Sequence, residues 1–119
     1  MIDCPVCKSE LQLSRLKCNG CGVVLEGSFQ LPRLARLKPE LRSLAEQMIL
    51  CGGNLKDLAT AKGVSYPTLR RMVDELMTIL QNMKDQDDQK VVALLEAIDK
   101  GHVSAEEGIR KIREIQGEI

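Results

Sequence analysis

Four of the five cysteines in this chain fall in two pairs near the amino terminus, and thiols in such pairs can bind metal. The pairs are Cys4 with Cys7 and Cys18 with Cys21, and ten residues separate them. A gap of two residues lets one tight turn direct both sulfurs at a single point, and the ten intervening residues suffice for a short hairpin. The spacing is typical of a tetrahedral zinc site. Because four thiolates leave no open position, we expect Zn²⁺ to be structural.

Other uses of the same cysteines stay open. Two disulfides can staple a secreted mini-domain, iron can occupy a rubredoxin-like site, and a Cys-x-x-Cys pair can act as a redox dithiol. Zinc is preferred because no segment before Cys4 resembles a signal peptide, and because only Phe29 offers the aromatic cover typical of iron sites. No apolar run reaches membrane-spanning length. We therefore expect a cytoplasmic chain with reduced thiols and no membrane partner.

Composition limits both fold and function. The chain has 119 residues with no Trp, one Tyr and one Phe, so its cores must be aliphatic, and one large core is not expected. Basic and acidic residues number three and three in residues 1–30, eight and five in 31–83, and six and nine in 84–119. Only the middle segment suits a polyanion. No base, nucleophile or open metal site converges, so we expect neither an enzyme nor a small-molecule substrate.

Three helices are expected after the cysteine-rich segment. Pro39 suits a first helical turn, and apolar residues then recur at three- and four-residue steps until Gly52. Asn54 can cap a second helix that ends at Gly63, and Ser65 can cap a third. The apolar residues expected to face the core are Phe29, Leu31, Leu41, Leu44, Ala45, Met48, Ile49, Leu55, Leu58, Ala59, Leu69, Met72, Val73, Leu76, Leu80 and Met83.

The turn before the third helix carries the fold assignment. Two helices that cross steeply need a small residue at their contact and a residue tolerant of positive φ at the corner, and Ala59 and Gly63 supply these. Val64 and Leu69 then provide the apolar contacts that fix the third helix across the second. The pattern predicts a trihelical helix-turn-helix.

Polar side chains at the start of the third helix can contact DNA. Arginines there can meet a guanine edge or a phosphate, and hydroxyls suit phosphate oxygens or bases. The candidate DNA-binding residues are Ser65, Tyr66, Thr68, Arg70, Arg71 and Lys56, with further phosphate contacts available from Arg33, Arg36, Lys38, Arg42 and Lys62. The alternative is a solvated charged surface, which Asp74 and Glu75 favour. With so small a positive excess, one site binds weakly, and useful affinity requires a dimer.

A helical hairpin is expected at the carboxyl end. The polar stretch Asp85–Asp88 is predicted to interrupt the helices, after which Val91, Leu94, Leu95 and Ile98 line a helix that Gly101 ends. Ser104 opens a capping box for a last helix with Ile109, Ile112 and Ile115 on its face. Gly108 is expected to weaken this helix by about 1 kcal/mol relative to alanine. Because so small a hairpin needs a partner surface, we expect packing on its own chain or, preferably, self-association.

The chain therefore divides into three segments: a zinc ribbon over residues 1–30, a helix-turn-helix over 31–83 and a helical hairpin over 84–119. The fold class is mainly α with a small amino-terminal β ribbon. Two further side chains are assigned no chemistry. Cys51 is expected to be a small buried hydrophobe at a helix end, and His102 a solvent-facing loop residue.

Several motifs, in this order, resemble bacterial domain-of-unknown-function family 2089. They are Cys4-Pro5-Val6-Cys7, Cys18-Asn19-Gly20-Cys21-Gly22, Leu31-Pro32-Arg33-Leu34, Gly53-Asn54-Leu55-Lys56 and Val64-Ser65-Tyr66-Pro67-Thr68-Leu69-Arg70. The resemblance covers about residues 3 to 81 and implies a small bacterial protein of regulatory role, with no established activity. Lys8 and Lys38 depart from the expected glycine and capping serine. The tail from Asp99 to Ile109 resembles a helical hairpin appended to many bacterial proteins.

Together these observations predict a zinc-stabilised DNA-binding protein, a bacterial transcriptional regulator that reads DNA with the third helix of its helix-turn-helix. The alternative is a protein-protein adaptor that grips RNA polymerase or a sigma factor without sequence-specific DNA binding. In the first case we expect a homo-oligomer.

Overall fold

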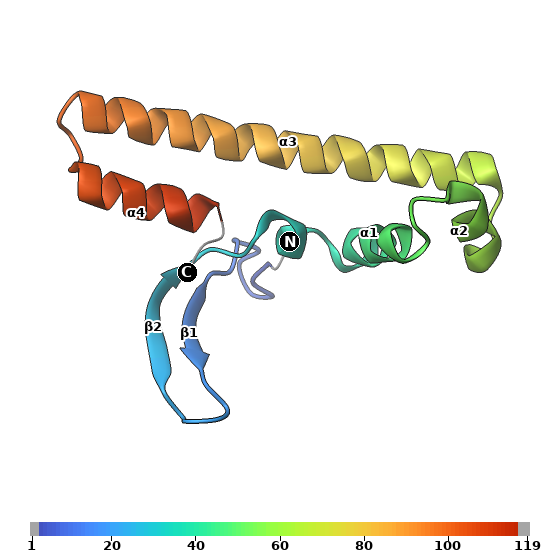
Figure 1. The fold of residues 1–119 in the computed structure, drawn as a ribbon, viewed down its shortest axis with the longest axis horizontal. Coiled ribbons are helices and arrows are strands. Elements are labelled where there is room, and N and C mark those ends of the chain that lie inside the picture. Colours follow the sequence, from blue (N-terminus) through green and yellow to red (C-terminus); the bar gives the residue numbers. More distant parts are fainter. Residues whose placement is uncertain (1–2, 117–119) are drawn as a thin grey trace.

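The computed structural model describes residues 3–116, and one long helix organises it. This helix, α3 (Tyr66–Asp99), extends along the longest dimension of a molecule that measures 54 × 40 × 32 Å. The helices α1 (Pro39–Leu50) and α2 (Leu55–Lys62) lie beside its first half, and α4 (Ala105–Ile115) lies beside its second half (Figure 1). The mainly helical fold class with a small amino-terminal sheet is confirmed. Residues 1–2 and 117–119, at the ends of the predicted ribbon and hairpin segments, lie outside the described residues.

The strands β1 (Leu13–Lys17) and β2 (Val24–Phe29) form an antiparallel pair, which with the two cysteine turns makes up the ribbon, residues 3–30. Arg15 lies opposite Glu26, and their side chains form an exposed ion pair at 3.7 Å. No residue of the ribbon is buried. Two strands with so little burial are marginal in water, so the ribbon depends on a further cross-link for its stability.

The core lies where α1, α2 and α3 meet. Its buried members are Leu37, Leu44, Leu58, Ala59, Leu69, Val73 and Leu76, and Met48 and Cys51 pack against them. Cys51 lies at the end of α1 and packs against the core as expected, but it is half-buried and not fully buried. The expectation for Ile49 is wrong, since its side chain is 74% exposed. Met48 takes the core-facing position, and Ile49, about 100° further around the helix, faces solvent.

Three more residues expected in the core lie outside the buried cluster. Phe29, Leu31 and Leu80 are only half-buried. Phe29 and Leu31 belong to the end of the ribbon and the segment after it, which are not packed into the junction of α1, α2 and α3. The core is therefore confined to the helix-turn-helix.

The predicted interruption at Asp85–Asp88 is wrong, because α3 continues through it without a break. Side-chain pairs one turn apart support the helix here. Gln81 Nε2 donates to Asp85 Oδ1 at 3.0 Å, and Lys84 Nζ lies 2.9 Å from Asp88 Oδ2. The first arm of the carboxyl-terminal hairpin is thus the second half of α3.

Asp87, within the same stretch, is buried by two arginines. The 3₁₀ turn η1 (Arg33–Arg36) follows the ribbon, and there Arg33 Nε and Arg36 Nη2 donate to Asp87 Oδ2 at 3.1 and 2.5 Å. The side chains of Asp87 and Arg36 are 4% and 8% exposed. Burial tends to raise the pKa of Asp87, but the hydrogen bond and charge of Arg36, joined by those of Arg33, outweigh burial and hold the pKa below its usual value.

The helix α4 packs against α3 through a glycine. Ser104 Oγ accepts from the N–H of Glu107 at 3.2 Å and begins α4 as predicted, and Gly101, with φ of 75°, follows the last turn of α3. Gly108 is buried, and a Cβ there would lie 2.3 Å from Ile98 Cδ1. Glycine therefore allows a close approach of the two helices.

The remaining expectations for the hairpin have mixed outcomes. Ile112 and Ile115 are half-buried, but the expectations for Ile109 and Leu95 are wrong, since these side chains are 50% and 53% exposed. Gly108, one position earlier, takes the place against α3. His102 is exposed in the turn, as expected. Self-association stays a prediction. Among the described helices, none is both long enough and apolar enough to cross a membrane.

Candidate nucleic-acid interface and metal centre

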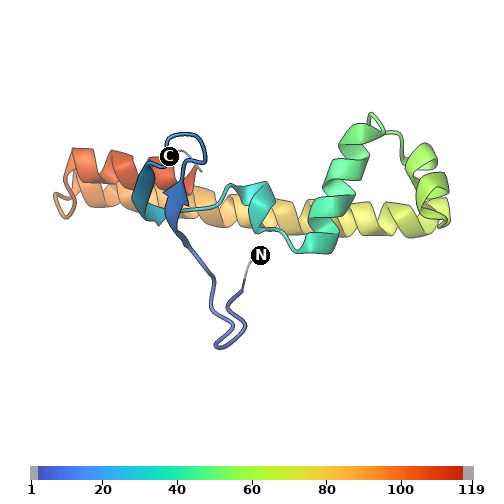
Figure 2. The same ribbon diagram turned by 90° about the horizontal axis from the view of Figure 1, so that it is seen from below.

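The corner between α2 and α3 has the predicted geometry. Gly63 adopts φ of 69°, and the N–H of Val64 donates to the carbonyl of Ala59 at 3.1 Å. Ala59 is buried at the contact between the helices, and Leu69 is fully buried. These contacts fix α3 across α2 and leave the first turns of α3 at one end of the molecule (Figure 2).

Hydroxyl groups cap the start of α3. Ser65 Oγ accepts from the N–H of Thr68 at 3.3 Å and donates to Thr68 Oγ1 at 2.9 Å. The Ser65 hydroxyl thus both accepts and donates, whereas Thr68 Oγ1 only accepts and keeps its own proton. Thr68 is half-buried. No acidic residue lies in the first turn of α3. The positive end of the helix dipole is therefore not offset by a carboxylate there.

The basic candidates differ in how freely they can meet an anion. Arg71 and Lys56 are exposed and make no ion pair within the described part of the chain. Arg70 Nε lies 3.3 Å from Asp74 Oδ1, so its charge is already partly compensated. Tyr66, 45% exposed, adds an aromatic ring and a hydroxyl beside them.

The wider set of phosphate-contact candidates needs correction. Arg33 and Arg36 face Asp87 and are not available to a phosphate. Lys62 Nζ donates to Gln47 Oε1 at 3.0 Å but stays exposed. Lys38 and Arg42 are exposed. Sequence reasoning missed the role of Asp87, for which no local signal exists.

The two cysteine turns have the same backbone structure. In the first, the N–H of Cys4 donates to the carbonyl of Ser9 at 2.8 Å, and that of Lys8 donates back to Cys4 at 2.9 Å. The second repeats both bonds at the same spacing and lengths, from Cys18 to Val23 and from Gly22 to Cys18. Lys8 and Gly22 occupy the same place with φ of 65° and 76°. Lys8 thus adopts the left-handed conformation for which a glycine was expected.

Hydrogen bonds within each turn favour the thiolate form of one cysteine. The Ser9 hydroxyl, then the Ser9 N–H and the Cys4 thiol, lower the pKa of Cys7. The N–H of Cys21, then the N–H of Gly20 and the Cys21 thiol, lower the pKa of Cys18. Because the thiolate is the metal-binding form, each turn suits a zinc ligand pair.

The two turns do not meet. The first turn precedes β1 and extends away from α3, whereas the second joins β1 to β2 at the other end of the strand pair (Figures 1 and 2). Within residues 3–116, no three Cys, His, Asp or Glu side chains form a group that can hold a metal ion. The donors fit zinc in chemistry and turn geometry, and Cys4, Cys7, Cys18 and Cys21 would hold it as a structural cross-link. Their convergence on one ion stays a prediction.

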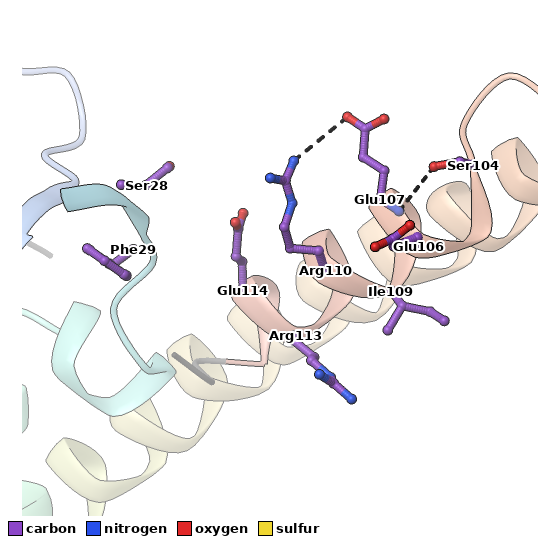
Figure 3. Close-up of a pocket in the computed structure, with 10 residues that line it drawn as sticks. Ser28, Phe29, Ser104, Glu106, Glu107, Ile109, Arg110, Arg113 and Glu114 are labelled. Atoms are coloured by element: carbon purple, nitrogen blue, oxygen red, sulfur yellow. Dashed lines mark hydrogen bonds and ion pairs between the residues drawn. The ribbon is translucent and has the colours of Figure 1, made fainter. Parts of the chain in front are cut away.

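A cavity also lies remote from α2 and the start of α3. It has a volume of about 1020 Å³ and separates the end of β2 from α4 (Figure 3). Ser28 and Phe29 lie on one side, and Ile109, Arg110 and Glu114 on the other. Its lining mixes both charges with two apolar side chains, and sequence reasoning gave it no role.

Comparison with known families finds a match for the ribbon and another for the helix-turn-helix. The profile of the DUF2089 zinc ribbon matches residues 4–35, and that of the domain of unknown function (DUF2089)-HTH matches residues 37–83. The chain belongs to the DUF2089 family. The predicted family is confirmed, and it implies zinc binding by the ribbon and a nucleic-acid-binding role at a coarse level. No curated protein and no solved structure matches this DUF2089 chain.

The family assignment bears on the two candidate sites differently. The HTH profile of DUF2089 covers α1, α2 and the first half of α3, and its residues 37–83 include all six DNA-binding candidates. The zinc ribbon profile covers both cysteine turns. Residues 84–116 of this DUF2089 protein, with the second half of α3 and all of α4, lie beyond both matches.

Proposed function

We propose that this DUF2089 protein is a cytoplasmic bacterial transcriptional regulator that binds DNA with the start of α3. The observation that carries the proposal is the exposed first part of α3, fixed across α2, with Arg71 uncompensated and no carboxylate in its first turn. A helix held in this way can enter the major groove. The function is one of binding, with no catalytic step.

The residues have separate roles in this proposal. Arg71 reads a base edge or holds a phosphate, and Tyr66 contacts the backbone or a base beside it. Lys56, at the start of α2, holds a phosphate. Pro67 has no N–H, and the N–H groups of Thr68 and Leu69 already bond to Ser65. The N–H of Tyr66 and the hydroxyl proton of Thr68 are therefore the donors that the first turn offers to a phosphate. Arg70 contributes less, because Asp74 competes for it.

The electrostatics favour weak binding by a single chain. Two of the eight basic residues in the middle segment, Arg33 and Arg36, are committed to Asp87. With two or three phosphate contacts, the logarithm of the affinity falls against the logarithm of salt concentration with a slope of roughly −2 to −3. A regulator of this kind therefore needs a dimer. Val92 and Leu95, each 53% exposed on the second half of α3, favour this region for self-association.

Fluorescence anisotropy with genomic fragments at low salt tests the proposal. Arg71→Ala should weaken binding and reduce the salt slope by about one. Lys90→Ala is the matched control, because Lys90 is an exposed cation on the same helix, far from its start, with no ion pair among the residues described. No binding, or equal losses in the two variants, would overturn the proposal.

A protein-protein adaptor of the transcription machinery is the second candidate. The ribbon exposes apolar side chains, with Val6 90% and Val23 56% exposed, and such positions favour a protein partner. RNA polymerase or a sigma factor is the partner expected in this case. Failure of the chain to bind DNA, together with direct binding to purified RNA polymerase that Val23→Asp abolishes, would favour the adaptor.

A further inference from the structure

Another cavity lies within the helix-turn-helix, between the start of α1 and the first half of α3, and the proposed DNA binding makes no use of it. Its volume is about 390 Å³, which falls in the range of pockets that hold small molecules. Its apolar lining consists of Leu41 and Leu44 from α1 and of Met72, Ile79 and Met83 from α3. The cavity therefore suits a ligand with an apolar body.

The start of α1 brings unpartnered N–H groups to this cavity. No side chain caps α1, because Lys38, whose side chain has no acceptor, occupies the N-cap position where a serine was expected. Pro39 has no N–H, and the N–H groups of Glu40 and Leu41 have no acceptor among the described residues. Glu40 and Leu41 both line the cavity. The positive end of the helix dipole therefore lies at its edge.

A buried arginine in the same lining also lacks an acceptor. Arg36 is only 7% exposed, and its Nη2 donates to the Asp87 carboxylate. Its Nε is buried and has no hydrogen-bond partner within the described part of the chain. A buried guanidinium N–H without an acceptor is costly, so the cavity favours a ligand that brings an oxygen. Lys38, exposed in the same lining, adds a positive charge.

Two carboxylates limit how strongly this cavity attracts an anion. Glu40 and Glu75 also belong to the lining, and both side chains are exposed. Because water weakens the interaction between exposed charges, the two carboxylates lower the affinity for an anion without excluding it. Neutralising one of them should therefore strengthen the binding of an anionic ligand.

We propose that this cavity binds a short- to medium-chain aliphatic carboxylate, such as octanoate. The carboxylate accepts hydrogen bonds from the N–H groups of Glu40 and Leu41 and from Arg36 Nε, and the alkyl chain lies against Met72 and Ile79. The ligand thus supplies the acceptor that these donors lack and fills the apolar space beside them. For a ligand of this size with little excess charge to attract it, the expected dissociation constant is on the order of 1 mM.

The position of the cavity suggests a second consequence. Because its lining comes from both α1 and α3, a bound ligand holds these two helices together. Regulation of DNA binding by the ligand would rest on the proposed function, whereas binding of the ligand does not.

Amide NMR of the zinc-loaded full chain, titrated with octanoate below its micelle concentration, tests the proposal. The amide signals of Glu40 and Leu41 should shift and reach saturation. Octan-1-ol and octylamine have the same alkyl chain with a neutral or a positive head group, so both should bind at least about tenfold more weakly. Acetate, which lacks the alkyl chain, should produce no saturable shift.

One pair of variants tests the apolar end of the site. Ile79→Trp should fill the cavity and abolish octanoate binding. Met77→Trp is the matched control, because Met77 is 57% exposed on the same helix and lies outside the lining, so this variant should bind as the wild type does. Circular dichroism checks that both chains are folded.

Three variants test the polar end. Lys38→Ala should weaken octanoate binding by about two- to tenfold, because it removes a positive charge. Lys38→Ser should weaken it further, because a serine hydroxyl at the N-cap accepts from an N–H that the ligand would use. Glu75→Gln should strengthen it, because it removes a negative charge from the lining.

Several results would overturn the proposal: no saturable binding, equal binding of octanoate and octylamine, amide shifts confined to other parts of the chain, or unchanged affinity in Ile79→Trp or Lys38→Ser. No DNA is present in these titrations, so a failure of DNA binding would leave their outcome unaffected.

Discussion

The Asp87 carboxylate accepts a hydrogen bond from Arg36 across 51 residues of sequence, and both side chains are buried. Arg33 donates to the same oxygen. The contact joins η1, which follows the ribbon, to the middle of α3. Because this ion pair has little access to water, removing either partner would leave a buried charge unpaired and greatly lower the stability of the fold.

Asp87→Asn should lower the free energy of unfolding by about 3 to 5 kcal/mol, because it leaves the Arg36 charge buried without a counter-ion. Asp88→Asn is the matched control. Asp88 is exposed and pairs with Lys84 one turn away, so its loss should cost no more than about 0.5 kcal/mol. Urea denaturation followed by circular dichroism measures both. Similar costs in the two variants would show that the contact contributes little.

Acid should weaken the same contact. The pKa of Asp87 lies below its usual value in the folded chain, so the carboxylate stabilises the fold at pH values above its unfolded pKa, about 3.9. This stabilisation is lost as the pH falls from about 4 through the lower folded pKa. The difference in unfolding free energy between the wild type and Asp87→Asn should therefore be constant from pH 7 to 5 and shrink below pH 4. A difference that grows with acid would contradict this.

Gly108→Ala should be destabilising by about 1 to 3 kcal/mol, even though alanine is the better helix former by about 1 kcal/mol. The added Cβ would meet Ile98 Cδ1 at 2.3 Å and Cγ1 at 2.6 Å. In an Ile98→Ala background, which removes both atoms, the same substitution should be stabilising. Thermal unfolding of the four chains measures the reversal of sign. The same sign in both backgrounds would refute the close approach.

Gln86→Pro should cost at least about 3 kcal/mol and reduce helical circular dichroism, because proline removes a backbone hydrogen bond inside a continuous helix. Gln86→Ala, at the same exposed position, should be neutral or slightly stabilising. If proline at this position were tolerated as well as alanine, residues 85–88 would be a loop.

Natively prepared protein should contain one zinc per chain by elemental analysis. Cys7→Ser and Cys21→Ser, one in each turn, should both remove the metal, because a tetrahedral site that loses one thiolate binds zinc far more weakly. Cys51→Ser should retain it, since Cys51 packs on the core. If either the Cys7→Ser or the Cys21→Ser variant retained zinc, the four sulfurs would not share one ion.

Local signals in the sequence predicted the helix ends well. Asn54, Gly63 and Ser65 act on backbone groups within three or four residues, so their neighbours alone define their roles. Both turns of the ribbon and the capped start of α4 were predicted for the same reason.

Long-range partners could not be predicted in this way. The sequence indicates that an aspartate within a polar run faces solvent, because its distant partner Arg36 leaves no local signal. The same polar run led to the prediction of an interruption where α3 is continuous. Gly108 likewise reads as a weak point in a helix until Ile98 is placed against it. At the DNA-binding candidates, types and positions were predictable, but the engagement of Ser65 with Thr68 and of Arg70 with Asp74 depends on rotamers.

Because α3 is continuous, its length fixes the rotation of α4 about the helix axis relative to the start of α3. Each residue turns a helix by about 100° and advances it by about 1.5 Å, so the number of residues between Arg71 and Ile98 decides which way α4 points relative to the first turns of α3. One inserted residue would swing α4 by more than a quarter-turn, whereas seven would return it to within about 20°. Between Asp87 and Ile98, length changes in sevens therefore preserve the direction of α4 and single insertions do not, whereas an insertion before Asp87 would also move that carboxylate away from Arg36.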